Sequence, residues 1–103
     1  MSEACLEQTP EGNLRVLGAL DFLSVPALWQ QGRTLLEAGD ACEVDLAGVE
    51  RTDSAGVALL VDWTRHARVH GGTLRLRHIP AQMSAIVQVS GVQAVLDIAD
   101  DAA

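Results

Sequence analysis

The run Asp53-Ser54-Ala55-Gly56-Val57 places a hydroxyl group where one secondary-structure element is predicted to end and another to begin. The preceding run, Cys42–Leu46, alternates polar and apolar residues as a strand does, and apolar residues with helical spacing follow. Ser54 is therefore predicted at a strand–loop–helix corner, where free backbone N–H groups and the helix dipole favour a side-chain oxygen, a phosphate or a carboxylate. Either Asp53 or Ser54 simply caps the helix, or the Ser54 hydroxyl is functional.

The other residues that could do chemistry do not form a convergent set in the sequence. His66 and His70 share one helix face and could hold zinc, but no third ligand is evident. We therefore expect ordinary surface histidines and no metal, and His78 is expected in a loop or at a sheet edge. Ser54 has no recognisable base and orienting acid, and no Gly-x-Ser-x-Gly elbow surrounds it. We predict no catalytic residues, no enzymatic activity and no cofactor.

The helix that begins near Ser54 is predicted to bury one face and to carry a second strip along its flank. The residues expected to face the sheet are Val57, Leu60, Val61, Thr64 and Ala67. The flanking strip consists of Leu59, Trp63, His66 and His70. Either Leu59 and Trp63 pack against a neighbouring helix of the same domain, or the strip binds a partner protein with Trp63 as an exposed hot spot.

The composition restricts the classes of partner. The chain of 103 residues is 49% hydrophobic, which suits one compact domain without a linker. Its net charge is −7, and its seven basic residues, all arginines, are scattered, so nucleic-acid binding is not expected and an anionic lipid surface would repel the chain. No secretory signal and no apolar run of the roughly 20 residues that span a bilayer is present, so we expect a cytoplasmic protein. Cys5 and Cys42 are expected to be small buried residues.

The first half of the chain is predicted to form a hairpin and a helix. The segments Ala4–Gln8 and Asn13–Leu20 read as two strands separated by turn-forming residues. A helix is predicted to start at Ser24 and to end by Gly39. Trp29 lies beside the apolar stripe of this helix, and we favour a position in the core over one with an edge at the surface.

The second half is predicted to form a βαβ unit followed by a third helix. Cys42–Leu46 is the central strand, Ser54–Val69 the helix, and Thr73–Ile79 the returning parallel strand. The corner with Ser54 then lies at the carboxyl end of the central strand. Pro80 opens the third helix, and Ala94–Ala99 is either a short helix or a short strand.

Four runs together resemble a STAS domain, the fold of anti-sigma-factor antagonists and of certain transporter subunits. They are Gly18-Ala19-Leu20-Asp21, Val44-Asp45-Leu46-Ala47-Gly48-Val49, Asp53-Ser54-Ala55-Gly56-Val57 and Ser90-Gly91-Val92-Gln93-Ala94-Val95-Leu96. The resemblance implies a single α/β domain over residues 1–103, with a core of about 12–97 and amphipathic helices packed on a mixed β-sheet. It also implies that Ser54 occupies the phosphoacceptor position of the antagonists, although Ala55 departs from the Ser or Thr common beside it.

The finer resemblance is to the small STAS subunit of the Mla phospholipid transporter of Gram-negative bacteria. It rests on Leu20-Asp21, on Val25-Pro26-Ala27-Leu28-Trp29 and on the run from Arg51 to Leu60. It implies a non-catalytic subunit that binds and supports the transporter's ABC ATPase, in a system that maintains outer-membrane lipid asymmetry. The chain would reach the inner membrane only through that partner. The alternative is an anti-sigma-factor antagonist that a partner kinase switches by phosphorylating Ser54.

Both functional interpretations, the transporter subunit and the anti-sigma-factor antagonist, predict a binding surface at the corner and along the flank of the second helix. The predicted partner-binding residues are Thr52, Asp53, Ser54, Ala55, Gly56, Leu59, Trp63 and His66.

Overall fold

The computed structural model describes residues 3–99, which form five strands and three helices, and the two alternate after an initial pair of strands. The strands are β1 (Cys5–Gln8), β2 (Leu14–Leu20), β3 (Ala41–Thr52), β4 (Thr73–Arg77) and β5 (Asp97–Ile98), and the helices are α1 (Val25–Leu36), α2 (Ser54–Val69) and α3 (Ala81–Ser90). The sheet has the order β1-β2-β3-β4-β5, with β1 antiparallel to β2 and the other neighbours parallel. This is the mixed α/β architecture that the sequence predicts.

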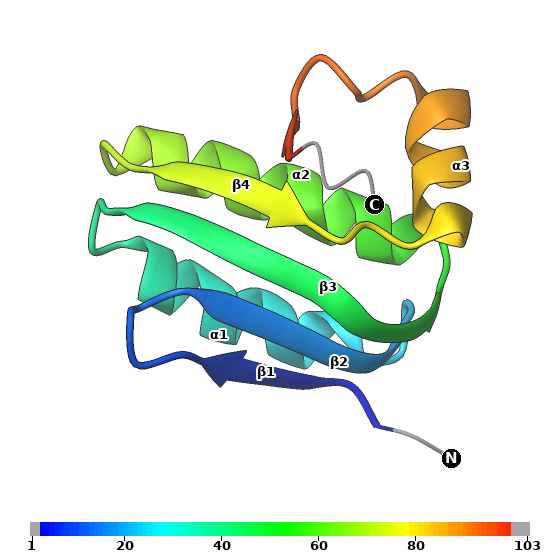
Figure 1. Ribbon diagram of the computed structural model, residues 1–103, viewed down its shortest axis with the longest axis horizontal. Helices are drawn as coiled ribbons and strands as arrows, with labels where there is room; N and C mark the ends of the chain where they lie inside the picture. The colour runs from blue at the N-terminus through cyan, green and yellow to red at the C-terminus, as the bar shows by residue number, and fades with distance from the viewer. Residues whose placement is uncertain (1–2, 100–103) are drawn as a thin grey trace.

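The two long helices cover one face of the sheet. Figure 1 shows α1 and α2 side by side behind the strands, with α3 at the end where β3 and β4 finish. The strand residues follow this asymmetry, because Val44, Leu46 and Leu76 are buried while the residues between them point to the open face. One apolar core therefore lies between the sheet and the helix pair.

The open face carries charges in alternating rows. The strand register aligns Glu7, Arg15, Asp45 and Arg77 across β1 to β4, and it aligns Glu43, Arg75 and Asp97 in a second row. Neighbours of opposite sign approach closely, as in the pair of Arg15 and Glu7 at 3.6 Å. Opposite charges on neighbouring strands favour this register, although each exposed pair contributes little alone.

The close packing of α1 on α2 depends on the absence of a side chain at Gly32. The indole of Trp63 is fully buried beneath α1, and a Cβ atom added at Gly32 would lie only 2.2 Å from its ring. The Trp63 Nε1 atom donates a hydrogen bond to the Trp29 carbonyl oxygen at 3.2 Å, so its polar group is satisfied. The two helices therefore approach through one glycine and one tryptophan.

Several predicted elements are confirmed. α2 spans Ser54–Val69 as predicted, β1 and β2 form the predicted hairpin, and the chain ends its described part in the short strand β5. His78 lies in the loop after β4 with a φ angle of 56°. Cys42 is buried, and this burial raises the pKa of its thiol.

Three predictions are corrected. β3 does not stop at Leu46 but continues to Thr52, because irregularities in its register with β2 accommodate extra residues of β3 without ending the pairing. Trp29 has an edge at the surface, with 41% of its area exposed, because Trp63 fills the space beneath α1. Cys5 is exposed because β1 is an edge strand with little cover.

The helix seam gives a first prediction. Gly32→Ala forces a Cβ atom into the Trp63 ring, so we expect the free energy of unfolding to fall by about 1–3 kcal/mol. Urea denaturation measures this change. Gln30→Ala, an exposed change on the same helix, should stay within about 0.5 kcal/mol of the parent. Equal stability of the two variants would show that the seam tolerates a wider spacing.

Asp45 on the open face gives a pH prediction. Partial burial acts to raise the pKa of this carboxyl, but hydrogen bonds from the Ala47 N–H and the His78 ring, with the charges of His78 and Arg15, outweigh it and lower the pKa. A carboxyl with a lowered folded-state pKa stabilises the fold above its ordinary pKa of about 4 and loses that contribution as pH falls through the folded value. Urea unfolding between about pH 6 and about pH 3 should show a shallower loss of stability in Asp45→Asn than in the parent. A parallel decline in both proteins would contradict the assignment.

Candidate functional site

The Asp53 carboxylate fixes the corner between β3 and α2. Asp53 is the N-cap of α2, and its Oδ1 atom accepts a hydrogen bond from the Ala55 N–H at 2.8 Å. Its Oδ2 atom accepts one from the Phe22 N–H at 3.3 Å, in the loop between β2 and α1. One side chain therefore caps α2 and holds the neighbouring loop against it.

Ser54 is the first residue of α2, and its side chain is exposed. Asp53 performs the capping, and no hydrogen bond from another residue of the described chain engages the Ser54 hydroxyl. Of the two interpretations offered by the sequence, the cap is therefore Asp53, and the Ser54 hydroxyl is left available at the surface. The backbone N–H groups of the first turn lie beside it, where a negative charge is favoured.

Thr52 and Gly56 form the buried support beneath this corner. The Thr52 hydroxyl donates to the Leu20 carbonyl oxygen at 2.8 Å and so ties the end of β3 to the end of β2. A Cβ atom at Gly56 would lie 2.2 Å from the Thr52 hydroxyl oxygen, so the first turn of α2 can lie this close to the end of β3 only with glycine at this position. Both residues position the corner from below.

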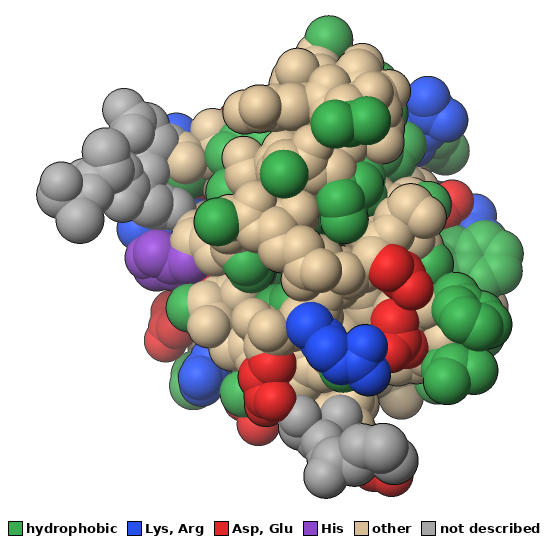
Figure 2. Space-filling view, turned by 90° about the vertical axis from the view of Figure 1, so that its right-hand side faces the viewer, with side chains coloured by type: hydrophobic (Ala, Val, Ile, Leu, Met, Phe, Trp, Pro, Cys, Tyr) green, Lys and Arg blue, Asp and Glu red, His purple; other side chains and the backbone are tan. Residues whose placement is uncertain are grey.

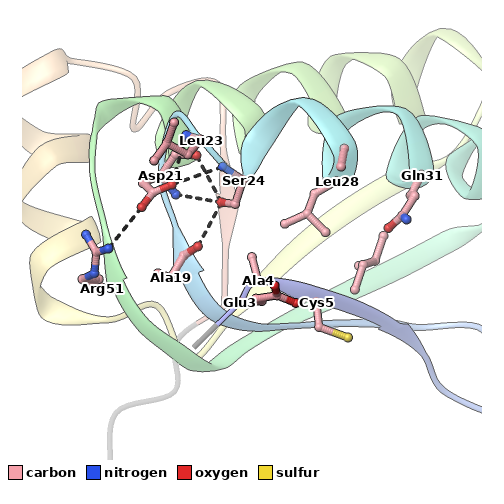
Figure 3. A pocket seen from close by; sticks show the side chains of 12 residues that line it. Glu3, Ala4, Cys5, Ala19, Asp21, Leu23, Ser24, Leu28, Gln31 and Arg51 are labelled. Carbon is pink, nitrogen blue, oxygen red and sulfur yellow. Dashed lines mark hydrogen bonds and ion pairs between the residues drawn. The ribbon is translucent and has the colours of Figure 1, made fainter. Parts of the chain in front are cut away.

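The loop between β2 and α1 is held by its own polar network, which Figure 3 shows. The Asp21 Oδ1 atom accepts from the N–H groups of Leu23 and Ser24, at 3.0 and 3.2 Å. The Ser24 hydroxyl accepts from the Asp21 N–H and donates to the Ala19 carbonyl oxygen at 2.9 Å. Arg51 on β3 pairs with the Asp21 carboxylate at 3.4 Å. These contacts also frame a cavity of about 560 Å³ between β1 and α1.

This rigid loop presents apolar side chains to solvent. Phe22 is 68% exposed and Leu23 is 78% exposed, at the same end of the molecule as Ser54. Figure 2, which looks at that end, shows hydrophobic side chains gathered along one side with charged groups beside them. Large exposed apolar side chains close together are typical of a protein-binding surface.

Two shallow grooves flank the exposed ridge of α2. A groove of about 220 Å³ between α1 and α2 is lined by Val25, Trp29, Ala55, Ala58, Leu59 and Asp62. A second, of about 360 Å³, runs toward α3 and is lined by Ser54, Val57, Ala58, Val61, Asp62, Arg65, Ser90 and Val92. We call Phe22, Leu23, Trp29, Ser54, Ala55 and Ala58 the Ser54 surface. It joins the loop, the exposed edge of Trp29 and the first turns of α2 at one end of the fold.

The structure separates the predicted binding residues into two sets. Asp53, Ser54, Ala55 and His66 are exposed or half-buried, whereas Thr52, Gly56, Leu59 and Trp63 are buried. Of the two alternatives for the flank of α2, packing of Leu59 and Trp63 against a neighbouring helix is therefore confirmed. An exposed strip with Trp63 as its hot spot is wrong, because α1 covers this side of α2. The exposed tryptophan at this end is Trp29, which sequence reasoning placed in the core.

A line of polar contacts runs along the seam between α1 and α2, and the sequence analysis did not predict it. Trp29 Nε1 donates to the Asp62 carboxylate, and the Arg33 guanidinium lies 3.5 Å from the same carboxylate and over the Trp29 ring. Further along, His66 Nε2 lies 3.2 Å from a Glu37 oxygen. These partners are about 30 residues apart in sequence, so only the packing of the helices reveals them.

The helices among residues 3–99 include none with the length and apolar character needed to cross a membrane.

Comparisons with known proteins converge on one family. A family model described as "Mlab, STAS domain" matches residues 6–97. The anti-sigma-B factor antagonist of Bacillus subtilis is 25% identical over 85 residues, which cover 82% of this chain and 78% of that protein.

Solved structures share the fold. An anti-sigma-factor antagonist domain protein from Planctomyces limnophilus superposes with a TM-score of 0.71 at 15% identity, covering 94% of this chain and 89% of that one. The phosphorylated form of the Bacillus cell-fate determinant SpoIIAA gives a TM-score of 0.68 at 20% identity, covering 95% and 92%.

The corner gives a prediction about its buried support. Gly56→Ala brings Cβ to 2.2 Å from the Thr52 hydroxyl oxygen and 2.8 Å from the Leu20 carbonyl oxygen, so we expect a loss of about 1–3 kcal/mol of stability. Chemical denaturation measures it. Ala58→Ser, an exposed change one turn along α2, should leave stability within about 0.5 kcal/mol. A Gly56→Ala variant as stable as the parent would mean that α2 can shift outward freely.

Proposed function

We propose that this chain, which belongs to the STAS domain family, is a non-catalytic subunit that docks through the Ser54 surface on the ATPase of an ABC phospholipid transporter. The observation that carries the proposal is the match of residues 6–97 to the family model described as "Mlab, STAS domain". The run from Arg51 to Leu60 and the run Val25–Trp29 support the same branch. ATP binding and hydrolysis belong to the partner.

The geometry of the Ser54 surface suits a protein partner. Phe22, Leu23 and Trp29 supply exposed apolar area, and aromatic anchors of this kind dominate binding energies at interfaces. Ser54 lies at the rim of the groove toward α3, so its hydroxyl can donate or accept one interfacial hydrogen bond. The loop and the helix start are rigidly tied through Asp53, so the surface needs little ordering on binding.

The proposed location is cytoplasmic and peripheral to the inner membrane, with the partner as the only link to the bilayer. The net charge of −7 supports this, because anionic lipid headgroups repel an acidic protein. The role in maintaining outer-membrane lipid asymmetry then follows from the transporter and requires no lipid site on this chain.

A second candidate function is that of an anti-sigma-factor antagonist switched by phosphorylation of Ser54. The Ser54 hydroxyl is exposed and does not cap the helix, which favours this function, and so does the 25% identity to the anti-sigma-B factor antagonist. A phosphate there adds about −1.5 to −2 charges at a helix N-terminus, which the helix dipole tolerates. The same dianion beside Asp53 would oppose docking of an apolar partner surface.

Affinity purification of the tagged chain from the organism that encodes it separates the two functions. Recovery of an ABC ATPase with its permease, identified by mass spectrometry, supports the transporter subunit. Recovery of a small ATP-binding anti-sigma kinase, with phosphate on Ser54 when that kinase and ATP are supplied, supports the antagonist and rejects the transporter proposal.

Ser54→Glu tests the docking surface directly. The new carboxylate lies at the first residue of α2, where the helix dipole favours it, so the fold should be retained. An unpaired charge buried in the interface should weaken binding of the ATPase by about 2 kcal/mol or more, a factor of roughly 30, measured by calorimetry or surface plasmon resonance.

Thr34→Glu is the matched control for this experiment. It adds the same charge to an exposed position near the other end of the helix pair and should leave the affinity unchanged. Unchanged affinity of a folded Ser54→Glu variant would remove the Ser54 surface from the interface.

A further inference from the structure

The C-terminal ends of α1 and α2 bring three metal-binding side chains together at the end of the helix pair away from Ser54. Glu37 is the C-cap of α1, while His66 and His70 lie in and just after the last turn of α2. One ligand atom from each of the three lies within 4.8 Å of the others. Glu37 is the third ligand that the sequence alone does not reveal.

We propose that Glu37, His66 and His70 form a binding site for a divalent transition-metal ion of the zinc class. Two imidazole nitrogens and one carboxylate oxygen are a donor set that zinc takes, with water as the fourth ligand. In a tetrahedral site with bonds of about 2.0–2.1 Å, neighbouring ligand atoms lie about 3.3 Å apart. The Nε2 atom of His66 and the nearer Glu37 oxygen are already 3.2 Å apart.

The hydrogen bond of His70 prepares its ring for metal binding. His70 Nδ1 lies 2.9 Å from the His66 carbonyl oxygen. In the neutral ring Nδ1 therefore carries the proton, and its N–H donates a hydrogen bond to that oxygen. Nε2 then has its lone pair free. This is the arrangement by which histidine ligands are usually oriented, with the other ring nitrogen bonded to a carbonyl or carboxylate.

His66 requires one rearrangement. In the metal-free chain its Nδ1 accepts from Arg33 at 3.1 Å, and its Nε2–H donates to Glu37 at 3.2 Å. The metal replaces that proton between Nε2 and Glu37, and the proton moves through water to Nδ1. Arg33 gives up this contact and keeps its pairing with Asp62 at 3.5 Å.

The surroundings otherwise favour a cation. Glu37 is half exposed and His70 is exposed, so both side chains can move the short distance needed to close the site. The site lies where two helices end, and the negative ends of their dipoles attract positive charge. The guanidinium of Arg33 opposes the metal, and we therefore expect an affinity in the micromolar range.

Isothermal titration of the untagged full chain with zinc chloride tests the proposal. We expect one zinc per chain, with His70→Ala and Glu37→Gln each weakening binding roughly tenfold or more. Loss of a residue that only orients a metal ligand already has an effect of this size, and these two variants remove a ligand itself. His78→Ala is the matched control, because His78 lies on the open sheet side beside Asp45 and should leave the affinity unchanged. Circular dichroism checks that each variant is folded.

Cobalt(II) in place of zinc gives a second measurement, since its visible absorption reports the coordination geometry. The bands of a four-coordinate site should appear in the parent and in His78→Ala and be lost in both ligand variants. The proposal is overturned if zinc does not bind at millimolar concentration, if the ligand variants bind as tightly as the parent, or if His78→Ala removes binding.

Discussion

The capping of α2 by Asp53 is the interaction on which the exposed end of the molecule depends. One carboxylate oxygen satisfies the helix start, and the other holds the loop that follows β2. If Ser54 were the cap, its oxygen would point back to the helix backbone. Because Asp53 takes that role, the Ser54 hydroxyl is not used for capping. The second Asp53 oxygen also fixes the position of the Phe22 loop beside Ser54.

Two close contacts determine which residues can reach a partner. Gly32 lets α1 descend onto the Trp63 ring, and Gly56 lets α2 begin directly over Thr52. The same approach that buries Trp63 leaves Trp29 on the outer side of α1, with one edge in solvent. The packing of the helix pair thus makes Trp63 a core residue and Trp29 a surface residue.

Local sequence determined the limits of α2, because an Asp-Ser start and a Gly-Gly stop are strong signals that act within a few residues. It failed where the outcome depended on distant partners. The polar–apolar alternation ends at Leu46, but continued pairing with β2 carries the strand on through a bulged segment to Thr52. Glu37 lies beside His66 only because α1 and α2 end at the same place. The sequence predicts where the corner between β3 and α2 lies. Which of its residues are exposed and which are buried depends on how the helices pack, and so only the structure shows it.

The alternating rows on the open sheet face affect how the charge of the whole molecule is distributed. The seven groups in those rows nearly cancel, with four carboxylates against three arginines. Outside them, residues 3–99 hold eight carboxylates against four arginines, so most of the excess negative charge lies off that face. The helices and their caps are balanced, with the carboxylates Glu37, Asp53 and Asp62 against the arginines Arg33, Arg65 and Arg68, so the excess lies in the turns and strand ends around the fold. A basic partner approaching by diffusion is steered toward those turns, and added salt weakens this orientation.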